Sequence, residues 1–175
     1  MIHDPASELL EHVDDEDRSI GPIPRGRAHK EGLWHRAVHV VVHNCHGRIL
    51  LQKRAAAKDY PGMWDTSVGG HVGAGESYQE AALRECKEEL GIHVREMDLG
   101  VVGKHLFDEL PTDVEWVETF ELEHEGPFHP DPAEVEQVRW FTADEVEALV
   151  TQGATTPHFA LQWRRELASM ARDLP

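Results

Sequence analysis

The sequence has few cysteines, few aromatic residues and no long apolar run, and each shortage excludes a class of protein. Its two cysteines, Cys45 and Cys86, do not make a disulfide framework and lack the spacing of a metal motif. No apolar run approaches the roughly 18 residues of a membrane span. The N-terminus shows no basic segment followed by an apolar one, so we expect no signal peptide and a cytoplasmic protein.

Cations are also scarce. The 17 Lys and Arg residues face 33 Asp and Glu residues, which gives a formal net charge of −16. Such a chain repels phosphate backbones, so we expect no binding to nucleic acid or to an anionic membrane. The 175 residues predict a single domain over 1–175, with a short N-terminal extension of about residues 1–30. We expect it to act as a monomer or a homodimer.

What the chain does have is a dense motif between residues 70 and 92. It follows the spacing G-x5-E-x7-R-E-U-x-E-E-x-G-U, in which U is a bulky apolar residue. The matching positions are Gly70, Glu76, Arg84, Glu85, Glu88, Glu89, Gly91 and Ile92, with the smaller Cys86 at the first U. The glycines before Glu76 allow backbone amides to approach a phosphate, and Gly91 predicts the end of a helix over residues 76–90.

This helix has an apolar arc and an acidic arc. The residues of the apolar arc, which we expect to face the core, are Tyr78, Ala82, Leu83, Cys86 and Leu90. The acidic arc holds Glu85, Glu88 and Glu89, whose oxygens suit Mg²⁺ or Mn²⁺. We expect Arg84 to pair with Glu76 or Glu88. The alternative is an ordinary solvated acidic face, against which the glycines and the spacing argue.

The remaining pattern predicts an α/β protein. A loop or a short helix is expected near residues 25–29, and helices are expected at 143–150, with a capping box from Thr142 to Glu145, and at 157–172. The apolar residues of the last helix are Phe159, Leu161, Trp163, Leu167 and Met170. Strands are expected at residues 9–13, 18–22, 35–43, 48–54, 64–69, 97–107, 113–122 and 138–141, with a turn at 111–113 between the two strands that flank it.

The motif resembles the Nudix box, the signature of hydrolases that cleave a diphosphate linked to another group. This resemblance implies a Nudix-type α/β/α sandwich with a central mixed sheet. It also implies a small-molecule diphosphate substrate, and Mg²⁺ (or Mn²⁺) held by Glu85, Glu88, Glu89 and the Gly69 carbonyl. The general base is either a box glutamate, Glu88 or Glu89, or Glu118, which shares its strand parity with apolar residues.

Segments outside the motif resemble the isopentenyl-diphosphate isomerase subgroup, which raises a second enzyme class. Those isomerases place a catalytic cysteine before a Gly-His pair, where this chain has Gly69. They also carry a Glu-x-Glu pair, whose second position is Val117 here. Without these two proton-carrying groups we reject isomerase activity. The resemblance implies that Arg54 and Lys58 bind the substrate diphosphate. The alternative is that they simply lie at the solvated end of a strand.

Histidine is abundant, with 13 residues. Because His35, His39 and His43 share one parity of a strand, we interpret them as lining a half-exposed face and not a zinc site. His29, His35 and His71 resemble isomerase metal-site histidines, but the broken Glu-x-Glu pair argues against a second metal there. The remaining hypothesis is a non-catalytic domain that binds a nucleotide, and the intact box argues against it.

Overall fold

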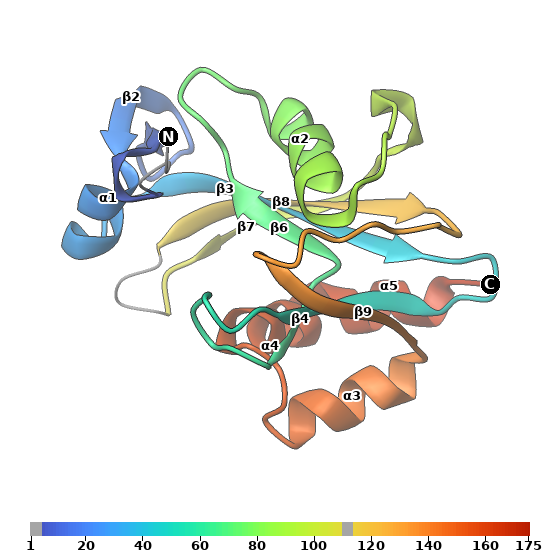
Figure 1. The fold of residues 1–175 in the computed structure, drawn as a ribbon. Coiled ribbons are helices and arrows are strands. Elements are labelled where there is room, and N and C mark those ends of the chain that lie inside the picture. The colour runs from blue at the N-terminus through green and yellow to red at the C-terminus, as the bar shows by residue number, and fades with distance from the viewer. Residues whose placement is uncertain (1–4, 110–113) are drawn as a thin grey trace.

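The computed structural model describes residues 5–109 and 114–175, and in this part of the chain a nine-stranded sheet lies between two helical layers. The strands are β1 (Leu9–Val13), β2 (Ser19–Pro24), β3 (His35–His43), β4 (Ile49–Arg54), β5 (Trp64–Asp65), β6 (Val68–His71), β7 (Gly100–Phe107), β8 (Glu115–Glu123) and β9 (Val135–Phe141). The helices are α1 (Arg25–Glu31), α2 (Tyr78–Leu90), α3 (Ala143–Thr151), α4 (Pro157–Gln162) and α5 (Ala168–Asp173), with short 3-10 turns at Pro5–Ser7 and Glu96–Asp98. Figure 1 shows α2 on one face of the sheet and α3, α4 and α5 on the other.

The sheet divides into two parts at β3. Strand β3 pairs in parallel with β8 over its whole length and antiparallel with β6. It meets β4 only at His43↔Ile49, after which β4 runs beside β5 and β9. A gap therefore opens between β6 and β4. The mixed sheet between helical layers confirms the expected α/β/α sandwich.

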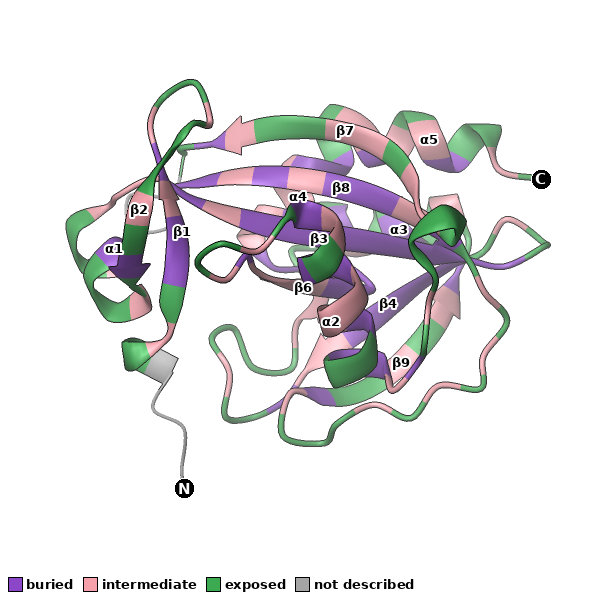
Figure 2. Ribbon diagram, turned by 90° about the horizontal axis from the view of Figure 1, so that it is seen from above, coloured by how far each residue is buried: buried purple, intermediate pink, exposed green. Residues whose placement is uncertain are grey.

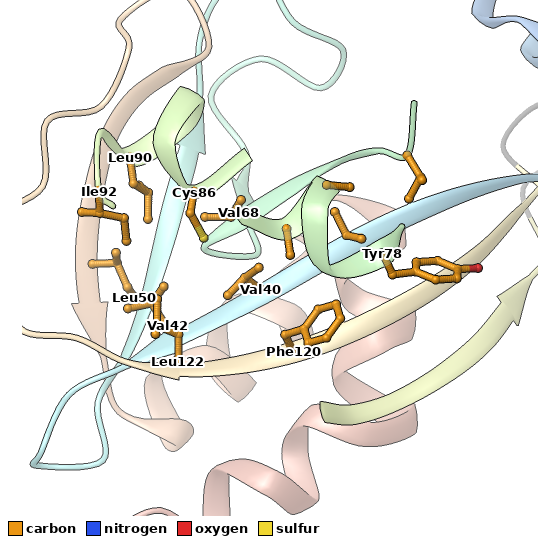
Figure 3. Close-up of a cluster of buried hydrophobic side chains, with 14 residues drawn as sticks. Val40, Val42, Leu50, Val68, Tyr78, Cys86, Leu90, Ile92, Phe120 and Leu122 are labelled. Carbon is orange, nitrogen blue, oxygen red and sulfur yellow. The ribbon is translucent and has the colours of Figure 1, made fainter. Parts of the chain in front are cut away.

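Helix α2 covers one face of the sheet. Ser77 caps it, since its hydroxyl accepts from the Glu80 amide while the Glu80 carboxylate accepts from the Ser77 amide. Gly91, with φ of 66°, ends it. Figure 3 shows the apolar side chains of α2 meeting those of β3, β4 and β8. Most of the expected arc is buried, but Leu83 is only half-buried and Ala81 takes its place in the core.

The opposite face is covered by the C-terminal helices. Residues 157–173 form α4, a π-helical turn at Trp163–Leu167, and α5, close to the expected single helix over 157–172. Phe159, Trp163 and Leu167 are buried as expected. The helix α3 begins with the expected capping box at Thr142.

The histidines of β3 do not line a half-exposed face, and that expectation was wrong. His35, His39 and His43 are all buried, with 0%, 8% and 7% of their surface exposed. Helices cover both faces of this central strand, so neither parity reaches solvent. Figure 2 shows β3 as buried along nearly its full length.

The strand expected at residues 64–69 is broken into β5 and β6. At Ser67 the chain leaves β4 and joins β3, and the Ser67 hydroxyl bridges the two strands. It donates to the Leu50 carbonyl and accepts from the Val42 amide at 2.8 Å. A side chain thus replaces backbone pairing at the gap in the sheet. The turn expected at residues 111–113 lies outside the described residues.

The N-terminal segment packs against the glycine-rich loop that precedes α2. Leu10 forms a bridge with Gly73, and the Glu11 amide donates to the Val72 carbonyl at 2.9 Å. The expected β1–β2 hairpin and the helix α1 are present. Among the helices of the described residues, none is long and apolar enough to cross a membrane.

Candidate functional site

The loop between β6 and α2 positions the acidic helix. Its backbone amides from Val72 to Ser77 are all engaged within the protein. Two of them bind carboxylates, since Gly73 donates to Glu76 at 2.8 Å and Gly75 donates to Glu11 at 2.7 Å. The loop therefore does not present the free amides that we expected for a phosphate. Instead it fixes Glu76 and the start of α2.

Arg84 is the centre of the ion pairs on α2. Its guanidinium donates to Glu76 twice at 2.9 Å, to Glu88 at 3.1 Å and to Glu85, and it also donates to the His71 carbonyl at 2.9 Å. The hydrogen bonds to Glu76 are the largest cause that raises the pKa of Arg84. The expected pairing of Arg84 is present with both candidate partners. One cation thus holds three carboxylates and the end of β6 in a fixed arrangement.

Glu85 lies against the backbone of β6 at Gly70. A Cβ atom at position 70 would collide with the Glu85 carboxyl group, so only glycine permits this contact. Burial raises the pKa of Glu85 to about 7, against the opposing influence of Arg84. The motif therefore requires glycine at position 70, because Glu85 packs against the backbone there.

Glu89 occupies the gap between the two parts of the sheet. The residue is only 7% exposed, and its Oε2 accepts from the Gly69 amide and from Gln52 Nε2, both at 2.9 Å. Burial, followed by the neighbouring Glu85, raises the pKa of Glu89 to about 8. An anion is costly in this position unless a cation accompanies it.

The residues present fit a divalent cation, although they do not form a closed cage. Glu85 and Glu88 turn toward Arg84, while Glu89 turns toward Gly69 and Gln52. The side chain of Glu88 is 57% exposed, in contrast to the buried Glu89. Mg²⁺ keeps several of its waters and needs only one or two protein carboxylates, which this open arrangement offers.

Arg54 and Lys58 are both ion-paired in the structure. Arg54 donates to Asp65 at 3.0 Å and to the Asp59 carbonyl at 2.6 Å, while Lys58 pairs with Glu134. Asp65 is among the charges that raise the pKa of Glu89, so the Arg54–Asp65 pair lies beside the gap in the sheet. A diphosphate would have to compete with carboxylates for these cations.

Glu118 lies on the same face of the sheet as Glu85 but away from the box carboxylates. In the sheet register Val38 stands between Gly70 and Glu118, which separates the two backbones by about 10 Å. Glu118 is half-buried, and burial raises its pKa while Lys104 and Arg36 oppose that rise.

A second cluster lies on the opposite face of the sheet and includes the three histidines that resemble isomerase metal ligands. Single donor atoms of His29, His35, His71 and Glu115 all lie within 4.8 Å of one another. Glu115 Oε1 is 3.3 Å from His35 Nε2 and 3.2 Å from His71 Nε2. Imidazole and carboxylate together suit a transition-metal ion. This group, which we call the histidine cluster, is assembled without the second carboxylate whose absence had argued against a metal.

Electrostatics in the histidine cluster favour a neutral His29 imidazole beside one carboxylate. Burial, with the neighbouring His71 and His35, lowers the pKa of His29 to about 4. Burial by itself would raise the pKa of Glu115, but hydrogen bonds from His35 and His71 hold it well below its ordinary value. The cluster therefore presents an anion at Glu115 and a neutral nitrogen donor at His29, the forms that bind metal.

Behind Gly69 there is little room for a side chain. A Cβ atom at position 69 would lie 3.1 Å from the His39 ring and 3.3 Å from Thr66 Cγ2. The His39 ring is held by Gln162, with 2.8 Å between His39 Nδ1 and Gln162 Oε1. A side chain at position 69 would therefore require the His39 ring to shift.

Comparison with known proteins agrees with this geometry. Residues 33–161 match the family model described as NUDIX domain. An uncharacterized Nudix hydrolase of Pseudomonas aeruginosa is 37% identical over 143 residues, covering 80% of this chain and 83% of that protein. An isopentenyl-diphosphate Delta-isomerase of Nocardia farcinica is 35% identical over 166 residues, covering 93% of each chain. A crystal structure of a Deinococcus radiodurans protein aligns with a TM-score of 0.77 at 27% identity, covering 90% of this chain and 98% of that one. The chain therefore belongs to the Nudix hydrolase family.

Proposed function

We propose that the protein is a Mg²⁺-dependent pyrophosphohydrolase, with Mn²⁺ as a substitute, that cleaves a diphosphate linkage in a nucleoside diphosphate derivative or a related small molecule. The observation that carries this proposal is the buried Glu89 between Gly69 and Gln52, with Glu85 packed on Gly70 beside it. The cost of these two buried carboxylates is relieved by a divalent cation. The cytoplasmic location and the monomeric or homodimeric state stay predictions.

In this proposal Glu85, Glu88, Glu89 and the Gly69 carbonyl hold the cation, and Arg84 keeps the carboxylates in place. A bound Mg²⁺ supplies neutralisation of charge on the diphosphate oxygens and a lower pKa for water. Glu88, which is exposed, or Glu118 accepts the proton of the attacking water. Glu89 is the alternative base, although its Oε2 already accepts hydrogen bonds from Gly69 and Gln52.

Arg54 and Lys58 bind the diphosphate in this proposal. Because both are paired with carboxylates, substrate must displace Asp65 and Glu134. The negative charge that builds up in the transition state strengthens contacts with cations. Displacement of the two carboxylates therefore favours the transition state over the bound ground state.

The test is a titration of metal-free protein with Mg²⁺ against a panel of diphosphates that includes nucleoside triphosphates, nucleotide sugars, coenzyme A, dinucleotides and prenyl diphosphates. Products are identified by mass, and ¹⁸O-labelled water locates the bond that breaks. We expect metal-dependent cleavage between two phosphorus atoms with one ¹⁸O in a product. Binding of a nucleotide without cleavage would favour the non-catalytic alternative.

A second candidate, isomerisation of a prenyl diphosphate, is favoured by the histidine cluster and by the Nocardia relative. Two residues oppose it. Gly69 carries no thiol, and a Cβ atom there would meet the His39 ring at 3.1 Å, while Val117 is buried where a carboxylate would be required. Assaying isopentenyl diphosphate separates the candidates, because hydrolysis releases phosphate and isomerisation forms dimethylallyl diphosphate. The histidine cluster itself is a candidate for a second ion of a transition metal, measurable by metal analysis of the purified protein.

A further inference from the structure

A third group of metal-ligating side chains lies at the far end of the sheet, where β3 turns into β4. Cys45 and His46 belong to that turn, and Glu125 follows the end of β8. One donor atom from each of the three lies within 4.8 Å of the others, and Cys45 Sγ is 3.3 Å from His46 Nδ1. We propose that this group, the Cys45 triad, is a binding site for Zn²⁺ or a chemically similar transition-metal ion.

The turn that carries two of the ligands is held by its own hydrogen bonds. Asn44 Oδ1 accepts from the amides of His46 at 3.1 Å and Arg48 at 3.0 Å. The Gly47 amide donates to the Asn44 carbonyl at 3.0 Å, and Gly47 has a φ of 65°. An asparagine turn closed by a left-handed glycine has little freedom, so the backbone beneath Cys45 and His46 is preorganised.

Glu125 reaches the same place from another strand. Its Oε1 accepts from the Cys45 amide at 2.8 Å. The preceding His124 is fixed on both sides, since its amide donates to the His43 carbonyl at 3.0 Å and its Nδ1 accepts from the Gly126 amide at 2.9 Å. The third ligand is therefore oriented by backbone contacts before any ion arrives.

The donor types and their spacing select the ion. Thiolate, imidazole and carboxylate are the ligands of Zn²⁺, which is tetrahedral in most protein sites. With bonds of about 2.3 Å to sulfur and about 2.0–2.1 Å to nitrogen, a tetrahedral angle separates the two donors by about 3.5 Å. The observed 3.3 Å is close to that value. Three protein ligands leave one position for water, and Mg²⁺, which prefers oxygen, does not compete.

The Cys45 triad is separate from both sites described above. It lies beyond His43, at the opposite end of β3 from His35, and eight residues of strand span about 26 Å. Cys45, His46 and Glu125 are all exposed, so an ion reaches them directly from solvent. Binding ties the β3–β4 turn to the end of β8. The effect of the metal is therefore on the stability of this end of the sheet and on the reactivity of Cys45.

The test is titration of the reduced, metal-free full-length protein with Co²⁺, read by absorption in the near ultraviolet. Ligation by a thiolate gives a charge-transfer band that nitrogen and oxygen ligands do not give, so the histidine cluster does not interfere. We expect the band to reach saturation, to vanish in Cys45→Ser, and to persist in Cys86→Ala, which removes the buried thiol under α2. His46→Gln and Glu125→Gln should each weaken Co²⁺ binding at least tenfold.

A second readout uses Zn²⁺ itself. Cys45 is the exposed cysteine, so its alkylation rate reports its accessibility. Zn²⁺ at the lowest concentration that saturates the wild type should slow its alkylation at least tenfold and slow that of Glu125→Gln much less. Absence of the Co²⁺ band, a band unchanged by His46→Gln and Glu125→Gln, or an alkylation rate indifferent to Zn²⁺ would overturn the proposal. Thermal unfolding of each variant confirms that the exposed substitutions leave the fold intact.

Discussion

Replacing Glu89 by glutamine should make the metal-free protein more stable at neutral and alkaline pH. The amide keeps the shape of the carboxylate and retains an oxygen that accepts from the Gly69 amide and from Gln52. It removes a buried negative charge next to Glu85. The Glu89 carboxylate, which the proposed metal site requires, therefore destabilises the protein when no metal is bound.

The magnitude follows from the pKa of Glu89. Burial raises it from an ordinary value of 4.5 to about 8. Because the folded-state pKa lies above the unfolded one, the wild type retains its full stability below pH 4.5 and loses part of it as the pH rises through 8. At about 1.4 kcal/mol per pH unit, the loss is about 3 kcal/mol at pH 7 and about 4–5 kcal/mol above pH 8.

The assay is urea unfolding in EDTA at pH 5 and at pH 9, for the wild type, Glu89→Gln and the exposed control Glu96→Gln. We expect the stability difference between Glu89→Gln and the wild type to grow by several kcal/mol between the two pH values, while Glu96→Gln follows the wild type. Added Mg²⁺ should close the gap by stabilising the wild type alone. An equal difference at pH 5 and pH 9 would refute the burial of an unpaired carboxylate at this position.

Three further predictions concern the surroundings of Glu89. Arg54→Ala should lower kcat/KM by about 2–4 kcal/mol in transition-state free energy with little change in Tm, and kinetics equal to those of the wild type would leave Arg54 as a structural partner of Asp65. Gly69→Ala should lower the unfolding free energy more in the wild type than in a His39→Ala background, by about 1 kcal/mol or more, because the new Cβ lies 3.1 Å from the His39 ring. Equal losses in the two backgrounds would show that the ring moves aside freely. Incubation with isopentenyl diphosphate should yield no dimethylallyl diphosphate. Its formation above background would favour isomerase activity over hydrolysis.

The sequence best predicted the helices and strands whose ends are marked by local residues, such as a turn or a terminal glycine. The apolar β-branched run of β3 is bounded by a turn at Asn44–Gly47, and residues 35–43 were predicted without error. Helix α2 ends before Gly91 as predicted, but it begins at Tyr78 and not at Glu76, because Ser77 caps it. Arg84 pairs with Glu76 and Glu88 as predicted, whereas Glu89 turns away from Arg84 toward Gly69 and Gln52.

The features that the sequence did not predict depend on contacts between distant segments. The histidine cluster draws its ligands from α1, β3, β6 and β8, and no local spacing signals that meeting. Glu89 is buried where the sheet divides, and at that division one hydroxyl, at Ser67, bridges two strands that are distant in sequence. The glycine-rich loop before α2 was predicted to bind phosphate on the assumption that its amides are free. In the structure two of these amides donate to the carboxylates of Glu11 and Glu76.

The most direct test of the central claim is the turnover of the best diphosphate substrate by Glu89→Gln, with Glu96→Gln as the matched control and the Tm of each variant measured alongside. The account predicts that Glu89→Gln lowers kcat by orders of magnitude while its Tm in EDTA equals or exceeds that of the wild type. Glu96→Gln should keep the activity and the Tm of the wild type. Wild-type turnover by Glu89→Gln in the presence of Mg²⁺ would contradict the assignment of Glu89 to the metal and with it the proposed site.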